Sequence, residues 1–418
     1  MVKMKDSGYI WIGNVPENWN ISKIKYHLKR KELKNPGNMK VLSVYREYGV
    51  IPKDSRDDNH NVTSEDTSKY KYVKPGMLVI NKMKAWQGSM GISEYEGIVS
   101  PAYFSYEFTD KLLYGRYIHY LLRNVYKDEF RRISGGIREG QWDLPAEGFA
   151  NEFIYLPAFE EQKKIADYLD EKCNEIDSLI SDIQAEIDIL ENYKKTVIVE
   201  AVTKGLDSNI QMKDSGIEYV GDIPNEWEIH PIYYYFKERK AKNYALKEQN
   251  LLSLSYGKII RKDINTNGGL LPANFNTYNI VEAGDIIIRP TDLQNDKRSL
   301  RTGLVTEHGI ITSAYIDLTP KEGINSEFFH YLLHAFDVMK VFYNMGNGVR
   351  QGLNYSEFSK LLIFAPSKQE QDEIVEYLND KCSIIEKTIS LKKEQLETLE
   401  EYKKSVIYEY VTGKKAVR

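Results

Sequence analysis

An internal repeat constrains this chain more than any other feature of its sequence. Residues 5–8 (KDSG) recur as residues 213–216, and residues 13–19 (GNVPENW) are matched by residues 221–227 (GDIPNEW), both at an offset of 216 − 8 = 208. Matches of this kind in one order indicate two copies of one structural unit, because chance similarity does not keep its order along a chain.

The matches continue to the end of each copy, with small insertions between them. They pair residues 75–80 with 283–288, 100–103 with 312–315, 119–122 with 330–333, and 156–157, 161–162, 168–169 and 172–173 with 365–366, 370–371, 377–378 and 381–382. The chain therefore consists of two similar units that follow one another.

The first part of each unit has an α+β pattern. Short β-branched or aromatic runs at residues 77–80, 285–288 and 310–318 lie between turns rich in Gly, Pro and Asn. One amphipathic helix is expected near residues 114–130, and its copy near residues 326–343. This part of each unit predicts a globular α+β domain.

The second part of each unit has the pattern of a coiled-coil helix. Residues 160–202 contain no Pro or Gly, and apolar residues recur at alternating steps of four and three. The predicted seam comprises Leu169, Ile176, Ile180, Ile183, Ile187 and Leu190 in the first helix and Leu378, Ile385, Ile389, Leu396, Leu399 and Val406 in the second. Lys194, Lys403 and Lys392 interrupt it, and we interpret Cys173 and Cys382 as small buried seam residues.

The order domain, helix, domain, helix dictates how the two helices can pair. If they pair with each other, the second must run back toward the first domain, so the pair is antiparallel and pseudo-two-fold symmetric. About 40 residues at about 1.5 Å each give a rigid spacer of roughly 60 Å. Such a spacer between two similar but unlike domains suits the reading of two different sites on one long ligand, and DNA is the obvious candidate.

Composition limits the other possibilities. The 418 residues suffice for two to three domains, and no apolar run is as long as a membrane span. Residues 1–6 lack a signal-peptide pattern, so we expect a soluble cytoplasmic protein. The net charge is −4, but residues 160–200 hold about twelve acids against five bases. Removing both helical regions leaves the globular regions near +4, which permits a polyanionic partner.

The sequence offers little for catalysis. A Walker A phosphate loop, an amino-methyltransferase tetrapeptide and a paired metal-ligand motif are all missing, and two cysteines cannot form a four-cysteine zinc site. His119 and His330 hold matched places in a helix and are interpreted as packing residues. The run 161–163 (EQK) fits half of a nuclease motif, but a solvated helix start is the better interpretation because no acidic strand precedes it.

Basic, polar and aromatic residues instead cluster in matched loops of the two units. Arg, Lys, Gln and Asn can reach base edges, and Lys and Arg also neutralise phosphates. The candidate DNA-binding residues are Tyr45, Arg46, Lys53, Lys82, Lys84, Trp86, Gln87, Arg138 and Gln141 in the first unit, and Tyr256, Lys258, Arg261, Lys262, Arg289, Gln294, Lys297, Arg298, Arg301, Asn347, Arg350 and Gln351 in the second. Because the clusters differ in sequence, the two units are expected to read different sequences.

The opening motif, residues 5–19 and 213–227, resembles that of the target recognition domains in type I restriction–modification specificity subunits. Residues 156–169 and 366–378 resemble the starts of the family's central and distal helical regions, and residues 190–206 resemble the end of the central one. The resemblance covers essentially the whole chain. It implies target recognition domains at 1–157 and 207–366, with coiled-coil helices at 158–206 and 367–418.

The resemblance also implies what such a chain does. Each recognition domain would read one half of a bipartite double-stranded DNA target, and the helices would set the gap and recruit two modification (methyltransferase) subunits. Restriction subunits would join through that complex. The chain would be non-catalytic and without a cofactor of its own, because S-adenosylmethionine, ATP and Mg would be bound by the partner subunits. The alternative is a coiled-coil adaptor that binds proteins and no DNA.

Overall fold

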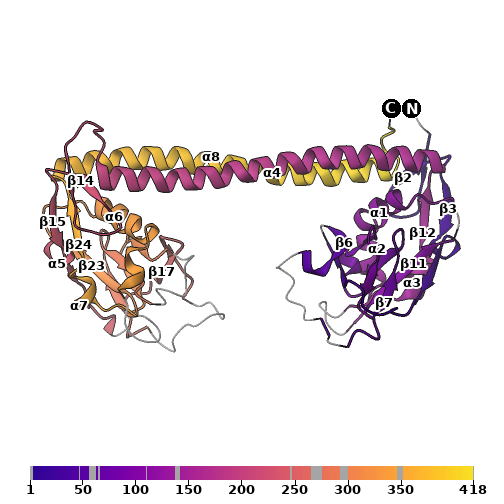
Figure 1. Cartoon of the computed structure of the whole chain (residues 1–418), viewed down its shortest axis with the longest axis horizontal. Coiled ribbons are helices and arrows are strands. Elements are labelled where there is room, and N and C mark those ends of the chain that lie inside the picture. Colours follow the sequence, from indigo (N-terminus) through magenta and orange to yellow (C-terminus); the bar gives the residue numbers. More distant parts are fainter. Residues whose placement is uncertain are drawn as a thin grey trace. The chain divides into compact units, whose positions relative to one another are not determined.

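The computed structural model describes residues 3–46, 48–55, 63–64, 66–109, 111–136, 142–244, 247–264, 275–291, 300–345 and 352–417, with only the backbone at 343 and 344. Two compact units divide the chain. Unit 1 comprises Met1–Gln184 and Glu394–Arg418, and unit 2 comprises Ala185–Lys393. Each unit thus contains one end of each of the two long helices, α4 (Phe159–Lys204) and α8 (Lys368–Val411) (Figure 1).

Unit 1 is built on a four-stranded antiparallel sheet, in the order β4 (Leu28–Lys31), β11 (Tyr103–Phe108), β8 (Leu78–Asn81) and β9 (Met90–Ile92). Four ribbons accompany it: β1 (Met4–Asp6) with β2 (Asn14–Pro16), β3 (Asn20–Lys23) with β12 (Phe153–Leu156), β5 (Leu42–Tyr45) with β6 (Gly49–Pro52), and β7 (Lys71–Val73) with β10 (Gly97–Val99). The helices are α1 (Gly115–Asn124), α2 (Lys127–Ile133) and α3 (Ala146–Asn151), with 3-10 turns η1 (Ile24–Tyr26), η2 (Lys53–Ser55) and η3 (Ala85–Gln87).

Unit 2 repeats this arrangement sheet for sheet. Its four-stranded sheet has the order β16 (Phe236–Glu238), β23 (Ile316–Pro320), β20 (Ile286–Ile288) and β21 (Thr302–Leu304). The ribbons are β13 (Met212–Asp214) with β14 (Asp222–Pro224), β15 (Glu228–Pro231) with β24 (Leu362–Ala365), β17 (Leu252–Ser255) with β18 (Lys258–Arg261), and β19 (Asn279–Val281) with β22 (Gly309–Ile311). The helices are α5 (Ile232–Tyr235), α6 (Ser326–Val338) and α7 (Tyr355–Phe358), with the 3-10 turn η6 (Val341–Asn344). The predicted α+β class with two similar domains and two paired long helices is confirmed.

The prediction of one continuous amphipathic helix in each unit is wrong in detail, because the helix is interrupted in both units. In unit 1 the chain forms α1 and α2, and the side chain of Asn124 donates to the carbonyl of Tyr120 at the end of α1 (2.9 Å). In unit 2 Lys340 adopts a left-handed conformation (φ 66°), which ends the helical run before η6. The apolar periodicity crosses both breaks, so it could not reveal them.

The repeated opening motif forms the same turn in both units. The ammonium group of Lys5 donates to the carbonyls of Glu17 (2.9 Å) and Trp19 (2.8 Å), and that of Lys213 donates to those of Asn225 (2.6 Å) and Trp227 (2.7 Å). Each lysine thereby fixes the loop that places its tryptophan, and both indole rings are almost completely buried.

The tryptophans connect the opening motif to the start of each long helix. The indole Nε1 of Trp19 donates to Glu161 (3.4 Å), and that of Trp227 donates to Glu370 (3.1 Å). The next residue, Gln162 or Gln371, is buried, and its amide donates to a carbonyl of Pro157 or Pro366 (3.0 Å in both). The residues of the half nuclease motif therefore serve as a structural joint. The solvated helix start expected for residues 161–163 is wrong for Gln162, which has no exposed surface.

Within each unit the two long helices pack in antiparallel order. In unit 1 Lys403 donates to both carboxylate oxygens of Asp177 (2.6 Å each). In unit 2 Lys194 pairs with Glu386, and Lys392 pairs with Glu186. As residue numbers rise along α4 they fall along α8. The predicted seam residues are all buried or half-buried, and the lysines that interrupt the seam each pair with an acidic residue of the other helix.

Exchange of the charges at one such pair tests its contribution. Both Asp177→Lys and Lys403→Asp should lower the stability of unit 1, whereas the double exchange should restore most of it. Because both side chains are partly exposed, the coupling should be about 0.2–1 kcal/mol. A thermal-unfolding double-mutant cycle gives this value. Additive effects of the two changes would show that the pair is not coupled.

A buried carboxyl pair distinguishes the sheet of unit 2 from that of unit 1. Asp285 and Asp317 are almost fully buried near a single arginine, Arg239, whose Nε lies 2.8 Å from Asp285 and 3.9 Å from Asp317. Neither side-chain oxygen of Asp317 has a hydrogen-bond partner among the described residues. Burial and the neighbouring Asp285 raise the pKa of Asp317 from 3.8 to about 8. In unit 1 the matching position is Ser105, which donates to the carbonyl of Lys31 (2.6 Å).

Asp317→Asn should therefore stabilise unit 2 in alkaline solution. The pKa of Asp317 is higher in the folded than in the unfolded chain, so the free energy of unfolding falls as pH rises toward about 8 and then levels off. The loss between pH 6 and pH 8 should be on the order of 1–3 kcal/mol, and Asn should abolish it. Hydrogen exchange of β20 and β23, with the sheet of unit 1 as the control, measures it. An equal pH dependence in parent and variant would contradict the assignment.

The matched histidines and cysteines serve the packing of the fold. Burial lowers the pKa of His119 and of His330 to about 3, so both are neutral packing residues, as predicted. Cys173 and Cys382 are buried free thiols in the seam. In the described part of the chain, no helix combines the length and apolar character that crossing a membrane requires.

Candidate nucleic-acid interface

The two matched hairpins carry several of the predicted DNA-binding residues. Tyr45 ends β5, and Arg46 begins the turn to β6, with Lys53 directly after that strand. In unit 2 Tyr256 lies in the turn between β17 and β18, with an exposed fraction of 86% and a positive φ of 47°. The structure therefore places these clusters of the two units on equivalent hairpins.

In unit 1 the hairpin lies beside the turn η3. The guanidinium Nη2 of Arg46 donates to Oε1 of Gln87 (3.1 Å), so two predicted residues from segments 41 positions apart meet at the surface. Lys84 is exposed at the start of this turn, and Lys53 donates to Oγ1 of Thr63 (2.5 Å). Lys82 takes no part in the Arg46–Gln87 hydrogen bond. Its ammonium group instead pairs with Asp143 (2.7 Å).

An aromatic and cationic cluster adjoins η3. The ring of Trp86 lies 5.8 Å from that of Trp142, and the guanidinium of Arg131 lies 5.7 Å from the first ring and 5.9 Å from the second. An exposed arginine that lies over two neighbouring indole rings is well suited to stack on bases or to contact phosphates. The elements α2 and η3 pack together and position this cluster.

Sequence reasoning missed Arg131 and Trp142. Arg131 lies in the last turn of α2, where its neighbours suggest an ordinary solvated helix end. Trp142 follows directly after the predicted cluster at 134–141. Its aromatic side chain next to that cluster was the available signal.

Unit 2 presents its basic residues differently. The Nε of Arg261 donates to both carboxylate oxygens of Glu307 (2.8 Å each), and the ammonium of Lys258 lies 3.6 Å from Glu386 of α8. Lys262 is exposed beside them. Arg261 and Lys258 are more than two-thirds exposed, so a phosphate can replace the carboxylate partner at little cost.

Two further residues of unit 2 are less accessible. Arg289 follows β20 and is half-buried. Arg301 has no exposed surface, and its Nη1 donates to the carbonyl of Thr291 (2.5 Å). A fully buried guanidinium contacts no ligand, so the expectation that Arg301 binds DNA is corrected to a structural role. Sequence alone gave no sign of its burial.

The remaining predicted residues lie outside the described part of the chain. They are Arg138 and Gln141 in the first copy and Gln294, Lys297, Arg298, Asn347, Arg350 and Gln351 in the second.

The long helices of unit 2 expose apolar side chains on one side. Tyr377, Ile384 and Leu391 are spaced by seven residues along α8, and Ile384 and Leu391 have exposed fractions of 63% and 52%. Ile189 and Tyr193 of α4 are also exposed, at heptad positions that face the same side of an antiparallel pair. We call these five residues the outer helical face.

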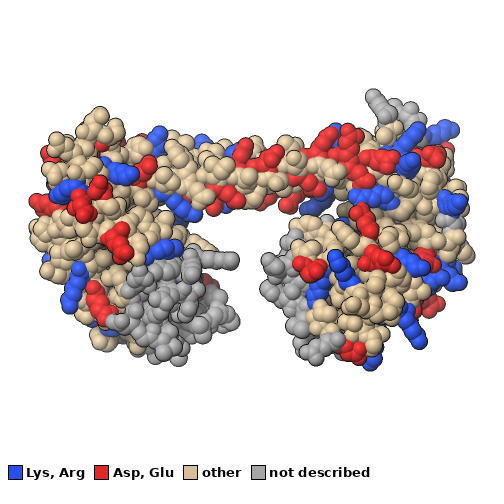
Figure 2. Space-filling model, viewed as in Figure 1, with Lys and Arg blue, Asp and Glu red and all other residues tan. Residues whose placement is uncertain are grey.

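The recognition part of unit 2 contacts the opposite side of the pair. The hydroxyl of Tyr331 donates to Asn379 (2.7 Å), and Asn325 donates to Asp372 (2.6 Å). These helical residues occupy heptad positions across the seam from the outer helical face. In the view of Figure 2, acidic side chains lie at several places along the long helices, with basic and uncharged side chains among them.

Among the described residues, no group of three or more His, Cys, Asp or Glu side chains is placed to hold a metal ion. The candidate interface is made of basic, polar and aromatic side chains on matched loops of two similar domains.

Comparison with known proteins identifies the kind of domain that this scaffold forms. Residues 16–188 match the family model of the type I restriction modification DNA specificity domain. The type I restriction enzyme MjaVIII specificity subunit of Methanocaldococcus jannaschii is 24% identical over 425 residues, covering 97% of this chain and 94% of that protein. The putative MjaX specificity subunit of the same organism is also 24% identical, over 428 residues, with coverage of 97% and 96%.

Solved structures show the same fold. A chain from a type I R-M system, studied for complex assembly and conformational transition, has a TM-score of 0.71 at 12% identity. The match covers 95% of this chain and 98% of that chain. The HsdS subunit from Thermoanaerobacter tengcongensis has a TM-score of 0.53 at 13% identity, with coverage of 96% and 98%. The chain therefore contains a type I restriction modification DNA specificity domain and is similar to type I specificity subunits over nearly its whole length, which confirms the resemblance noted in its sequence.

Proposed function

We propose that this chain is the DNA specificity subunit of a type I restriction–modification complex, and that each of its two units reads one half of a bipartite target. The observation that carries this proposal is the repeat itself. The two units share sheet order, opening turn and helix joint, whereas the loops that bear basic and aromatic residues differ. A shared scaffold with unlike loops suits the recognition of two different sequences.

In this proposal the recognition domains are residues 1–157 and 207–366, and the helical regions 158–206 and 367–418 set the gap between half-sites. Arg46, Gln87, Trp86 and the neighbouring Arg131 supply contacts from unit 1. From unit 2, the exposed hairpin residues Tyr256, Lys258, Arg261 and Lys262 supply them. Arg and Gln fit base edges, and the lysines fit phosphates.

The chain itself is a non-catalytic specificity subunit, so chemistry on DNA requires partners. We propose that two methyltransferase subunits bring S-adenosylmethionine, and that restriction subunits with ATP and Mg join through them in the cytoplasm. The outer helical face is the surface that we assign to a methyltransferase subunit in unit 2. Its exposed Ile and Leu side chains favour burial against an amphipathic partner helix.

Leu391→Lys should therefore weaken assembly with the methyltransferase while leaving the helices folded. The side chain is half exposed, so the substitution costs little within the chain, but a charge buried at an interface costs about 2 kcal/mol or more. We expect at least about tenfold weaker binding by calorimetry. Lys393→Ala, which removes an exposed lysine of the same helix, is the control. Equal affinity of parent and Leu391→Lys would remove this surface from the proposal.

A gel shift with the purified methyltransferase and duplex DNA from a random pool tests the function and its alternative. If the chain is a specificity subunit, a DNA complex should form and persist when a non-specific polyanionic competitor is added. If it is an adaptor, a complex with the methyltransferase should form without bound DNA. The absence of any specific DNA complex would contradict the proposal.

A further inference from the structure

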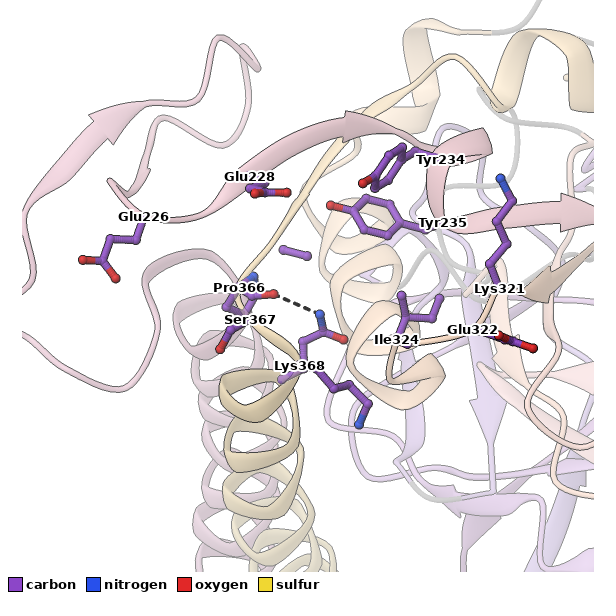
Figure 3. A pocket seen from close by; sticks show the side chains of 13 residues that line it. Glu226, Glu228, Tyr234, Tyr235, Lys321, Glu322, Ile324, Pro366, Ser367 and Lys368 are labelled. Carbon is purple, nitrogen blue, oxygen red and sulfur yellow. Dashed lines mark hydrogen bonds between the residues drawn. The ribbon is translucent and has the colours of Figure 1, made fainter.

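Unit 2 contains a pocket of about 510 Å³ where the recognition domain meets the start of α8. Its lining includes three apolar residues, Ile324, Ala365 and Pro366, and an aromatic wall formed by the rings of Tyr234 and Tyr235, among charged and polar side chains. The volume lies within the range of small-ligand and side-chain pockets. Figure 3 shows the lining residues, which come from β15 and the loop before it, α5, the loop after β23, the end of β24, and the start of α8 with the loop before it.

The hydroxyl of a largely buried tyrosine points into this pocket. Tyr235 is 94% buried (6% exposed), because its ring packs on Phe329 with centroids 4.6 Å apart. Figure 3 shows its hydroxyl directed into the space beside Glu228 and Pro366. No hydrogen bond of this hydroxyl is found among the described residues, and it is not one of the fully buried polar atoms that lack a partner, so solvent reaches it through the pocket. A polar group of a bound ligand can take the place of that solvent.

The charges around the pocket favour a cation. Glu226, Glu228 and Glu322 line it together with Lys321 and Lys368. Both lysines already have partners, because Lys321 donates to the carbonyl of Tyr233 (2.8 Å) and Lys368 pairs with Asp372 (2.5 Å). The carboxylates are more available, and among the described residues the ion pair found for Glu228 is with His230, whose Nε2 lies 3.2 Å from one of its oxygens. The pocket thus has an excess of acceptors.

The aromatic wall favours a planar cation. The ring of Tyr234 is half exposed, and His230 stacks on one of its faces at 3.9 Å with an interplanar angle of 17°. The Tyr235 ring stands nearly perpendicular to it, with centroids 5.0 Å apart. A guanidinium group can stack on a tyrosine face while its N–H groups donate to a carboxylate and a hydroxyl, and an ammonium group lacks this planar geometry.

Unit 1 does not repeat this chemistry. The strand pairing places Asn20 where unit 2 has Glu228, since Asn20 pairs with Leu156 and Glu228 pairs with Ala365. At the same offset Asn18 replaces Glu226 and His27 replaces Tyr235. The acceptor excess and the pocket-facing hydroxyl therefore belong to unit 2 and are not a consequence of the shared fold.

We propose that this pocket of unit 2 binds an arginine side chain of a partner polypeptide. The aliphatic stem lies against apolar lining residues such as Ile324 and Pro366, and the guanidinium donates to Glu228 and to the Tyr235 hydroxyl beside the Tyr234 ring. The site uses none of the residues assigned to DNA, so it does not depend on the proposed function.

Ligand-observed saturation-transfer NMR on the full chain tests the proposal, with a blocked tripeptide of alanine, arginine and alanine as the probe. The arginine peptide should bind saturably, and the matched peptide with citrulline, which is uncharged and of equal shape, should bind at least about tenfold more weakly. Glu228→Gln should weaken the arginine peptide about tenfold and Tyr235→Phe about threefold. Glu17→Gln, which removes an exposed acid from the equivalent loop of unit 1, should change nothing.

Equal binding of the arginine and citrulline peptides, or unchanged binding in Glu228→Gln, would overturn the proposal. Tighter binding of free L-arginine than of the peptide would overturn the assignment to a polypeptide. The citrulline comparison uses the parent chain, so misfolding of a variant cannot account for it. DNA selection is measured separately for the parent chain and the same variants. If the parent chain selects no DNA sequence, the proposed function is contradicted and this site is not.

Discussion

Insertion of one heptad into each long helix, after Gln184 and after Lys393, should lengthen the gap between the two DNA half-sites and leave both half-sites unchanged. These positions lie at matched levels of the antiparallel pair, between the Asp177–Lys403 and Glu186–Lys392 ion pairs. Seven helical residues add about 10 Å, which corresponds to roughly three base pairs of DNA. Selection from a random DNA pool by the complex with methyltransferase gives the new gap.

The control for this experiment is an insertion into α4 alone. It shifts the seam of one helix past the other, so that the ion pairs on the two sides of the insertion cannot form together, and the complex should lose affinity for any bipartite target. A change of sequence in either half-site of the double insertion would contradict the spacer role of the helices.

Arg46→Ala should relax selection at one half-site only. Its exposed guanidinium is held by Gln87 at the tip of the unit 1 hairpin, where a bidentate contact to a guanine edge is possible. Loss of such a contact costs about 1–3 kcal/mol, or roughly five- to 150-fold in affinity for the preferred base. Competition binding with targets altered in either half measures the effect, and Lys29→Ala, at an exposed position of β4, is the control.

The pattern of loss identifies the type of contact. If Arg46 reads a base, the parent's preference at one position disappears and the other half-site is read as before. Equal loss on every sequence, accompanied by a shallower salt dependence, would show a phosphate contact and contradict base reading by this residue.

The scaffold could be predicted from the sequence because its determinants are periodic or local. The heptad spacing of residues such as Ile176 and Ile187 specifies paired helices without knowledge of the rest of the fold. The repeat indicated two similar domains in the same way. The unlike breaks after Asn124 and at Lys340 escaped this reasoning because apolar periodicity continues through them.

The contacts that position the site could not be predicted, because they join distant segments. The bond between the Trp19 indole and Glu161 spans 142 positions, and no local pattern indicates it. The cluster of Trp86, Arg131 and Trp142 likewise exists only in the folded domain. Arg301 shows the reverse error, because a basic residue near a predicted loop proved to be fully buried.

The central claim is that the two units read two different DNA sequences at a fixed distance. Its most direct test is selection from a random duplex pool by the full chain with its methyltransferase, followed by sequencing of the retained DNA. The account predicts two enriched blocks of unlike sequence, separated by a gap of constant length and random composition. One continuous block, two blocks at variable distance, or no enrichment at all would contradict it.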